Sequence, residues 1–377
     1  MINSRKKILI FSTAYLPLVG GAEIAVKEIT DRLGDYDFDL ITARLDSKLP
    51  KKEVVGRVNV YRIGLGCSWD KFILMFTGHW LASKLHQNKN YDAMWAIMAS
   101  FGGLSAVLFK KKHSHIPFLL TLQEGDNLKA IESKTKILGS WWRNIFLLAD
   151  SVQCISNYLA AWSKEIGVAP SKVAVVPNGV DATLFFNQNL NLDHNFNLVT
   201  TSRLVYKNGL DLIIKALPLL PETVVLHIAG VGPEESNLKE LALKLGVLNR
   251  VVFHGLIPYE QLPQFLATGR IFIRPSRSEG LGNSFLEAMA VGLPIMAPLV
   301  GGIPDFLEDR QTGLVIEAEN PIDIADKIKW LLDDDNKLQV NEIRLRALSK
   351  TKETFSWGAV ASDMNTIFDQ LLDKKNI

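Results

Sequence analysis

Two carboxylates at Glu279 and Glu287 are the residues whose type and spacing first suggest chemistry in this chain. The glycine-rich turn Gly280-Leu281-Gly282-Asn283 follows the first, and a helical pattern surrounds the second. The apolar segment Arg270–Pro275, just upstream, has the pattern of a strand. Glycines let the backbone approach a ligand, and a helix N-terminus presents free N–H groups to an anion. Strand, turn and helix together favour a site for the diphosphate and sugar of an activated sugar donor.

The same segment also has a purely structural interpretation. Ser284 and Glu287 have the spacing of a capping box, in which two side chains bond backbone N–H groups at a helix start and no ligand is needed. Taken alone, the segment does not choose between a ligand turn and a helix cap. The elements around it must decide.

Length and composition indicate an ordinary soluble globular protein. The 377 residues are enough for two domains with a core each, and the chain is 47% hydrophobic and 22% charged. Net charge is +2, but residues 1–190 carry 23 Lys and Arg against 16 Asp and Glu. A basic N-terminal half fits an acidic ligand or an anionic membrane surface, and a merely solvated surface as well. No nucleic-acid partner is expected.

Cysteine usage and the chain start both favour a cytoplasmic location. Cys67 and Cys154 are isolated, which suggests neither a disulfide framework nor a zinc site and fits a reducing compartment. The basic residues 5–7 and the apolar run after them imitate a signal peptide, but the run is short and breaks at Pro17. No stretch approaches the roughly 18 apolar residues of a membrane span.

Short apolar β-rich runs alternate with helical patterns along the chain, which predicts an α/β architecture with mostly parallel sheets. In the first half, strands are expected at 6–12, 37–42, 58–63, 92–97, 117–122, 151–155 and 173–176. In the second half they are expected at 198–202, 224–229, 251–253, 271–274, 294–297 and 314–316, with helices near 209–217, 234–245, 260–267, 284–291 and 322–334. The polar run 187–197 between the halves is predicted to be a linker. Two such series suggest two doubly wound domains that face one cleft.

A second glycine turn stands near the N-terminus. Gly20-Gly21 separates the first predicted strand from a helical pattern at 21–29, which is the layout of a phosphate-facing turn, although a plain flexible turn fits equally. The turn is not a GxGxxG fingerprint, which disfavours a nicotinamide cofactor.

Two segments of the N-terminal half combine basic and aromatic residues. One is Lys71–Phe76 with Trp80; the other is Trp141–Arg143, which precedes the apolar run 145–148. Such segments bind membrane interfaces, and buried helix faces produce the same pattern. Both interpretations stay open at this point.

Several weak motifs follow one another in an order that is itself specific. They are Gly20-Gly21, Pro177–Asp181, Ser202–Leu204 with Gly209, His227–Pro233, His254-Gly255, Pro275-Ser276, Glu279 with Glu287, Gly301–Asp305 and Thr312–Leu314. Through these motifs the chain resembles the retaining GT-B glycosyltransferases of the group 4 family over nearly its whole length. The resemblance implies the GT-B fold, with two Rossmann-like domains facing a central cleft. The N-terminal, acceptor-side domain would be residues 1–190 plus about 356–377, because the family's last helix crosses back, and 191–355 would bind the nucleotide-sugar.

The resemblance also implies roles for individual residues. Glu279 corresponds to the carboxylate that accepts hydrogen bonds from the donor sugar, Arg203 to the arginine that binds the diphosphate, and Lys207 is assigned the neighbouring cation, so these three form the predicted catalytic set. The family's lysine slot itself holds Asn208 here. The predicted substrate-binding residues, with Glu287 on the ribose diol, are Gly20, Gly21, Gln123, Glu124, Asn178, Gly230, Gly280, Leu281, Gly282, Asn283 and Glu287.

One departure from the family pattern concerns proton transfer. Where many members have a histidine-aspartate pair, this chain has Gln123-Glu124, and an amide cannot exchange a proton at neutral pH. Glu124 and Asp126 are candidates for orienting the acceptor hydroxyl, and ordinary turn residues are an equal interpretation. Retaining transfer in this family can use the leaving phosphate as the base, so neither an enzymic nucleophile nor a metal or other cofactor is expected.

The sequence therefore predicts a retaining, hexosyltransferase-type glycosyltransferase. It would move a sugar from a UDP- or GDP-sugar to a saccharide or lipid-linked acceptor during polysaccharide or glycoconjugate assembly, in the cytoplasm or at the inner membrane face. Two alternatives remain: a sugar-nucleotide epimerase of the same fold, and a donor-binding protein without transferase activity. The presence of Arg203, Glu279 and Glu287 weighs against the second.

Overall fold

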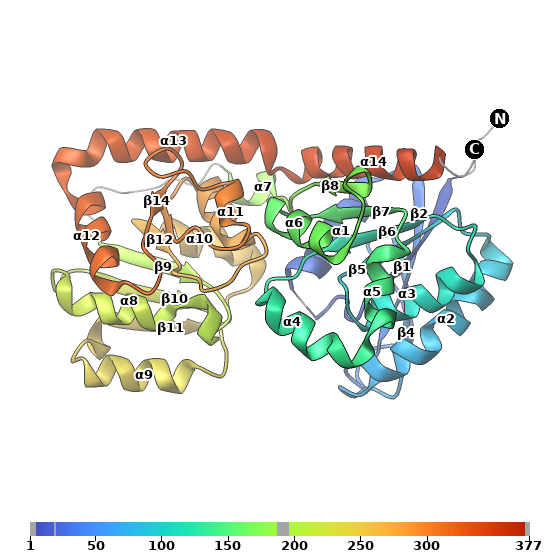
Figure 1. Cartoon of the computed structure of the whole chain (residues 1–377). Helices are drawn as coiled ribbons and strands as arrows, with labels where there is room; N and C mark the ends of the chain where they lie inside the picture. Colours follow the sequence, from blue (N-terminus) through green and yellow to red (C-terminus); the bar gives the residue numbers. More distant parts are fainter. Residues whose placement is uncertain (1–4, 19, 187–195, 374–377) are drawn as a thin grey trace. The chain divides into compact units, whose positions relative to one another are not determined.

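The computed structural model describes residues 5–18, 20–186 and 196–373 (Figure 1). The chain forms two compact units, Met1–Asn178 with Trp357–Ile377, and Gly179–Ser356. The predicted domain boundary at residue 190 and most of the predicted linker 187–197 lie outside the described residues.

The first unit is built on an eight-stranded sheet in the order β3-β4-β2-β1-β5-β6-β7-β8. All neighbouring strands are parallel except β3 and β4. The strands are β1 (Lys6–Phe11), β2 (Tyr36–Ala43), β3 (Lys52–Val55), β4 (Val58–Ile63), β5 (Ala93–Ile97), β6 (Phe118–Leu122), β7 (Ser151–Cys154) and β8 (Val173–Val175). Central parallel strands are buried on both faces, so they appear in the sequence as continuous apolar runs. The edge strand β3 was not predicted because its four residues are exposed or half-buried.

Helices cover this sheet, and one of them comes from the far end of the chain. They are α1 (Gly21–Arg32), α2 (Asp70–Lys89), α3 (Phe101–Lys112), α4 (Leu128–Thr135), α5 (Ser140–Leu147), α6 (Asn157–Ile166) and α14 (Trp357–Asp373). The apolar stripe of α14, with Met364 and Phe368, is buried in the same core as the strand residues Ile8 and Trp95. Tyr36 on β2 donates a hydrogen bond of 2.9 Å to Asp369.

The second unit contains a fully parallel six-stranded sheet in the order β11-β10-β9-β12-β13-β14. Its strands are β9 (Asn197–Thr201), β10 (Val225–Ala229), β11 (Val251–Gly255), β12 (Ile271–Ile273), β13 (Ile295–Ala297) and β14 (Leu314–Val315). In chain order this is the 3-2-1-4-5-6 arrangement of a doubly wound domain. The predicted α/β fold with two doubly wound units is confirmed.

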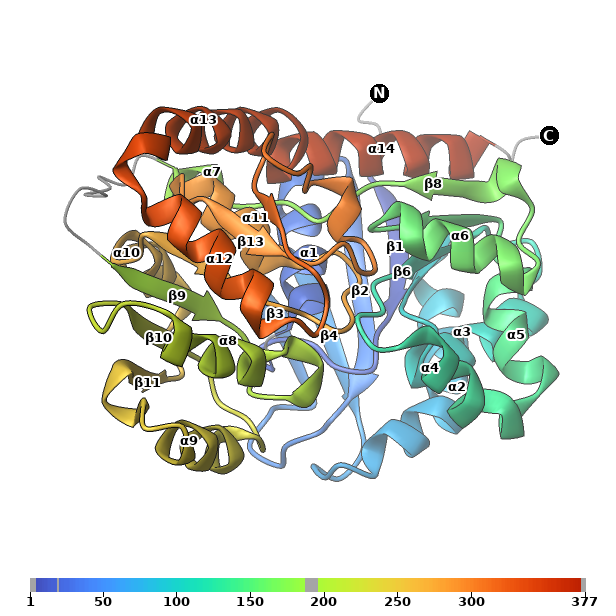
Figure 2. The same ribbon diagram turned by 60° about the vertical axis from the view of Figure 1, so that its left-hand side comes forward.

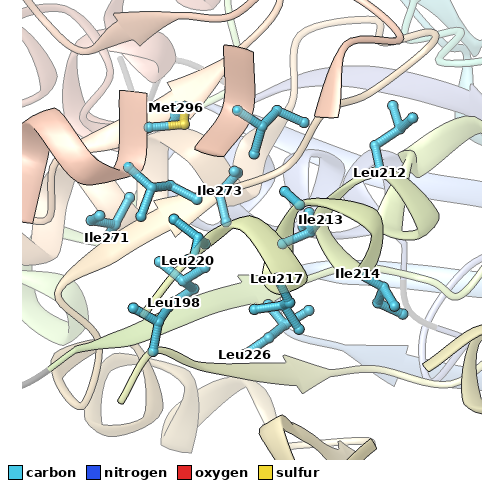
Figure 3. Packing of buried hydrophobic residues seen from close by; sticks show 14 of the residues in the cluster. Leu198, Leu212, Ile213, Ile214, Leu217, Leu220, Leu226, Ile271, Ile273 and Met296 are labelled. Atoms are coloured by element: carbon cyan, nitrogen blue, oxygen red, sulfur yellow. The ribbon is translucent and has the colours of Figure 1, made fainter. Parts of the chain in front are cut away.

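The helices of the second unit are α7 (Ala182–Phe185), α8 (Leu210–Ala216), α9 (Glu235–Lys244), α10 (Leu262–Ala267), α11 (Asn283–Val291), α12 (Pro321–Leu332) and α13 (Lys337–Thr354). Figure 2 shows α8 alongside β9 and β10. Ile213 of this helix and Leu217, directly after it, pack in one buried cluster with Leu198, Ile271 and Met296 of the strands (Figure 3). This core fixes the strand ends from which the site residues project.

Candidate active site

The strand order reverses between β9 and β12, and the loops that follow these strands carry most of the predicted site residues. In a doubly wound domain, ligands bind at the carboxyl ends of the strands beside such a reversal. Gly230, after β10, has a φ of +141°, and a Cβ at this position would lie 1.8 Å from the carbonyl oxygen of Ser202. Only glycine allows the loops after β9 and β10 to approach so closely.

Glu279 lies in the loop after β12 and is only 8% exposed. Its Oε1 accepts a hydrogen bond of 2.6 Å from Nη2 of Arg274 and one of 3.2 Å from Oγ of Ser276. Arg274 is itself buried, at 6% exposure, and forms an ion pair with Glu279. A buried carboxylate held by an arginine and a hydroxyl has a fixed orientation, which a residue that recognises sugar hydroxyls requires.

Glu287 lies on α11, one helical turn beyond Ser284, and is 9% exposed. Burial raises the pKa of its carboxyl to about 7, against the opposing charge of Arg274. The side chain makes no hydrogen bond to another described residue. The carboxylate oxygens of Glu287 can therefore accept hydrogen bonds from a diol.

The structure corrects the capping-box interpretation of this helix. α11 begins at Asn283, its N-cap is Gly282 in the left-handed region at φ +98°, and no side chain caps it. Ser284 therefore lies inside the first turn, where its Oγ accepts a hydrogen bond of 2.6 Å from Nη1 of Arg274. The N–H groups at the start of α11, in the predicted turn from Gly280 to Asn283, are thus not taken by Ser284 or Glu287.

The two predicted cations stand on the loop after β9. Arg203 is exposed, and its guanidinium has no hydrogen-bond partner among the described residues. Lys207 is half-buried in the short 3-10 turn Tyr206–Asn208. Asn208, in the family's lysine slot, is buried and donates a hydrogen bond of 2.6 Å to the carbonyl of Arg203, so it holds the loop.

Arg277, which sequence reasoning did not single out, fixes the same loop. Its backbone N–H bonds the carbonyl of Lys207 at 2.6 Å, and its guanidinium forms ion pairs with Asp211 and Glu319. It also lies over the ring of Tyr206 at 4.0 Å. Arg274 was missed as well. The sequence signal for it is a basic residue directly after the apolar run Ile271–Ile273. A charge at the end of a buried strand is unfavourable without partners, so such a residue indicates that the fold supplies them.

The remaining predicted residues lie in the first unit. Gln123 follows β6 and accepts a hydrogen bond of 3.1 Å from Nδ2 of Asn178. Glu124 is 4% exposed, and its Oε1 accepts a hydrogen bond of 2.7 Å from the backbone N–H of Ala99, in the loop after β5. Its Oε2 has no partner in the described chain, and burial raises the pKa of the carboxyl to about 7.

Gly20 and Gly21 stand at the start of α1, with Gly20 as the N-cap. The carboxylate of Glu23 folds back over this N-cap, so that a Cβ at Gly20 would lie 2.6 Å from its Oε2. A side chain of the same helix therefore lies against the predicted phosphate turn.

Within residues 5–18, 20–186 and 196–373, no group of three or more His, Cys, Asp or Glu side chains is arranged to bind a metal ion. The expectation that no metal is needed stays a prediction.

Known families match both halves of the chain. The model described as "Glycosyltransferase Family 4" matches residues 19–184, and "Glycosyl transferases group 1" matches residues 181–345. The chain belongs to the GT-B glycosyltransferases of this group, and its enzyme class is glycosyl transfer.

Particular relatives show how far the likeness extends. An uncharacterized glycosyltransferase of Methanocaldococcus jannaschii is 24% identical over 97% of this chain and 99% of its own length. A GDP-mannose-dependent α-(1-6)-phosphatidylinositol monomannoside mannosyltransferase of Mycobacterium tuberculosis is 33% identical over 49% of this chain, which spans 53% of that protein. The structure of HepE from Anabaena, in complex with UDP and glucose, has a TM-score of 0.78 at 18% identity and covers 97% of this chain and 100% of its own.

Proposed function

We propose that this glycosyltransferase moves a sugar, with retention of anomeric configuration, from a UDP- or GDP-sugar to a saccharide or lipid-linked acceptor. The observation that carries the proposal is the pair of buried carboxylates beside the strand reversal of the second unit, with Glu279 directly before the glycine turn and Glu287 on the helix that follows it. Two basic residues, Arg203 and Lys207, follow β9 at the same reversal. One relative is named as dependent on GDP-mannose, and the structure of another contains UDP.

Each of these residues fits one part of a nucleotide-sugar. The Glu287 carboxylate would accept hydrogen bonds from a ribose diol, and Glu279 would accept them from hydroxyls of the donor sugar. The N-terminal N–H groups of α11 would face the phosphates. Arg203 and Lys207 would stabilise the negative charge that builds on the departing nucleoside diphosphate.

The transfer step needs no side chain as nucleophile. The bond from the anomeric carbon to the phosphate oxygen breaks, the acceptor oxygen bonds that carbon on the same face, and the acceptor proton passes to the leaving phosphate. Positioning and charge stabilisation then supply most of the rate. In the first unit, which we propose holds the acceptor, Gln123 and Glu124 are fixed by Asn178 and Ala99. Their roles would be orientation of the acceptor.

A donor screen tests this function. Thermal unfolding is measured with UDP-, GDP- and ADP-sugars, and the stabilising donor is then incubated without acceptor. Slow release of nucleoside diphosphate is expected from a transferase, whereas a changed sugar on an intact nucleotide would identify an epimerase. Tight donor binding without turnover on any saccharide or lipid acceptor would identify a donor-binding protein. The anomeric configuration of the product, read by NMR coupling constants, decides retention.

We also propose that the enzyme is cytoplasmic and contacts the inner membrane face through the α2 surface, defined here as Trp69, Phe72, Ile73, Phe76 and Trp80. These residues recur at helical spacing on one face, and Trp69, Phe76 and Trp80 are 70%, 51% and 63% exposed. No helix of the described chain is long and apolar enough to cross a membrane.

The charges around the α2 surface favour anionic lipid as its partner. The sequence between Asp70 and Asp92 contains no acidic residue. Lys71 lies over the ring of Phe72, Lys84 is exposed one turn beyond Trp80, and the charge of Lys112 lowers the pKa of His79 after the effect of burial. Aromatic side chains bordered by lysines suit an interface with anionic headgroups.

The second basic-aromatic segment divides between surface and core. The ring of Trp141 lies 5.6 Å from that of Phe76 and so adjoins the α2 surface. Trp142, in contrast, is buried at 5% exposure and donates a hydrogen bond of 2.9 Å to the carbonyl of Ala99. Trp142 therefore belongs to the core of the first unit.

Sedimentation with lipid vesicles tests the α2 surface. Full-length protein is expected to bind phosphatidylcholine vesicles containing phosphatidylglycerol and to bind pure phosphatidylcholine poorly. The double variant Phe76→Ser, Trp80→Ser is expected to lose on the order of tenfold or more in binding, since it removes two of the three most exposed apolar side chains of this surface. Leu243→Ser with Leu256→Ser removes exposed leucines of the second unit (66% and 77% exposed) and is the matched control. Equal binding by both double variants would overturn the assignment.

A further inference from the structure

Arg274 is a buried guanidinium whose contacts join three segments of the donor site. It follows β12, is 6% exposed and stacks over the ring of Phe285 at 4.6 Å. Its Nη1 donates to the carbonyl of Thr201 at 3.2 Å and to Oγ of Ser284 at 2.6 Å. An arginine buried to this degree must find such partners, because an uncompensated buried charge is strongly destabilising.

The same guanidinium reaches the loop that carries Glu279. Its Nε donates to Oγ of Ser276 at 3.1 Å, and its Nη2 donates to Oε1 of Glu279 at 2.6 Å. Ser276 in turn donates to the same Oε1, so carboxylate, hydroxyl and guanidinium form a closed triangle. The planar fork of arginine makes these contacts at fixed angles, which a lysine ammonium cannot reproduce.

Arg274 also lies beside the helix face that carries Glu287, because its Nη1 donates to Ser284, one turn earlier on α11. Of the elements packed against α11, α7, α10 and β13 carry no charged side chain, and the charges of α13 do not shift the pKa of Glu287. Within the described chain, Arg274 is the charged group that lowers this pKa against the larger effect of burial. One side chain therefore orients the first carboxylate and partly neutralises the surroundings of the second.

We propose that Arg274 is a positioning residue of the donor site, which fixes the orientation of Glu279 and keeps Glu287 able to bind the donor as an anion. The inference rests on the proposed function, because it takes Glu279 and Glu287 as donor ligands. A merely structural role would predict a loss of stability alone. Positioning predicts a change in how nucleotide binding depends on pH.

Calorimetric titration of the full chain with UDP and with GDP, from pH 5.5 to 9, tests the proposal. In the wild-type protein, affinity is expected to rise with pH as Glu287 ionises near pH 7. In Arg274→Gln the rise is expected about one pH unit or more higher, with affinity at pH 7 reduced on the order of tenfold. Arg274→Lys keeps the charge without the fork, so the pH of the rise should stay while kcat for transfer falls.

The double variant Arg274→Gln, Glu287→Gln is the control for coupling. It should lose the pH-dependent rise, and its affinity should equal that of the single variant Glu287→Gln, because residue 287 is then an amide and because UDP and GDP carry no sugar for Glu279 to bind. A rise at the wild-type pH in Arg274→Gln would overturn the inference. If Arg274→Gln does not fold, Arg274→Lys decides, since unchanged kcat in that variant would also overturn it. Failure of the wild-type protein to bind either nucleotide would instead refute the proposed function.

Discussion

Replacing Glu124 by glutamine removes a titratable group from the core of the first unit while keeping an acceptor for the N–H of Ala99. The carboxyl has a pKa raised from 4.5 to about 7, mainly because burial disfavours the charged form. The unfolded chain loses its proton above about pH 4.5, whereas the folded chain keeps it until about pH 7. The folded state therefore binds more protons in this window, and its stability falls as pH rises.

The structure sets the size of this effect. A shift of about 2.5 pKa units corresponds to about 3 kcal/mol at 1.36 kcal/mol per unit, and Glu124 is buried enough that solvent screening does not reduce it. The free energy of unfolding of Glu124→Gln should exceed that of the wild type by less than about 1 kcal/mol at pH 5 and by about 3 kcal/mol at pH 8. Any change in stability that the amide itself causes is the same at every pH. The test is therefore the increase, from pH 5 to pH 8, in the difference between the two free energies of unfolding.

Urea unfolding followed by tryptophan fluorescence measures this difference. Trp142 and Glu124 both bond the backbone of Ala99, so the transition of the first unit is visible in the emission of Trp142. Glu165→Gln, which changes an exposed carboxylate on α6, is the control and should unfold like the wild type at each pH. A difference between Glu124→Gln and the wild type that stays constant from pH 5 to 8 would refute the reasoning.

Further predictions concern the second unit. Glu287→Gln should weaken nucleotide binding several-fold in calorimetry without lowering the melting temperature, because burial raises the pKa of this carboxyl and its charged form does not stabilise the folded chain. A loss of a few kcal/mol of stability with intact affinity would exclude the ribose role. Lys207→Ala should reduce transfer turnover more than Asn208→Ala, which removes a hydrogen bond to the Arg203 carbonyl and should cost about 1 kcal/mol of stability. If Asn208→Ala loses more turnover than Lys207→Ala, Lys207 is not the cation that stabilises the leaving group.

Most of the fold was predictable because its signals are local. Buried parallel strands such as β1, β5 and β9 are continuous apolar runs, and the glycine turns between them mark where strands end. The strand β3 was missed because an edge strand half exposed to solvent has no apolar run. Helix spacing in α14 was visible, and its apolar residues Met364 and Phe368 are buried in the core of the first unit.

The site was predictable only as a set of candidates. Glu279, Glu287 and Arg203 stand in motifs whose order along the chain is specific, and the sequence placed them without their partners. Ser284 had the spacing of a cap, yet the helix starts one residue earlier and its hydroxyl meets Arg274. Whether a hydroxyl caps a helix or bonds a neighbour depends on the side chains that the fold brings beside it.

The sequence by itself determined the alternation of strands and helices, the family and the candidate residues of the site, because residue type and spacing act over a few positions of the chain. Tertiary structure alone decided that Arg274 joins Thr201, Glu279 and Ser284, since these segments meet only when β9 and β12 pair. It also placed Trp80 at the surface and Trp142 in the core. Both tryptophans stand in basic-aromatic segments, and only packing against the rest of the unit separates an exposed ring from a buried one.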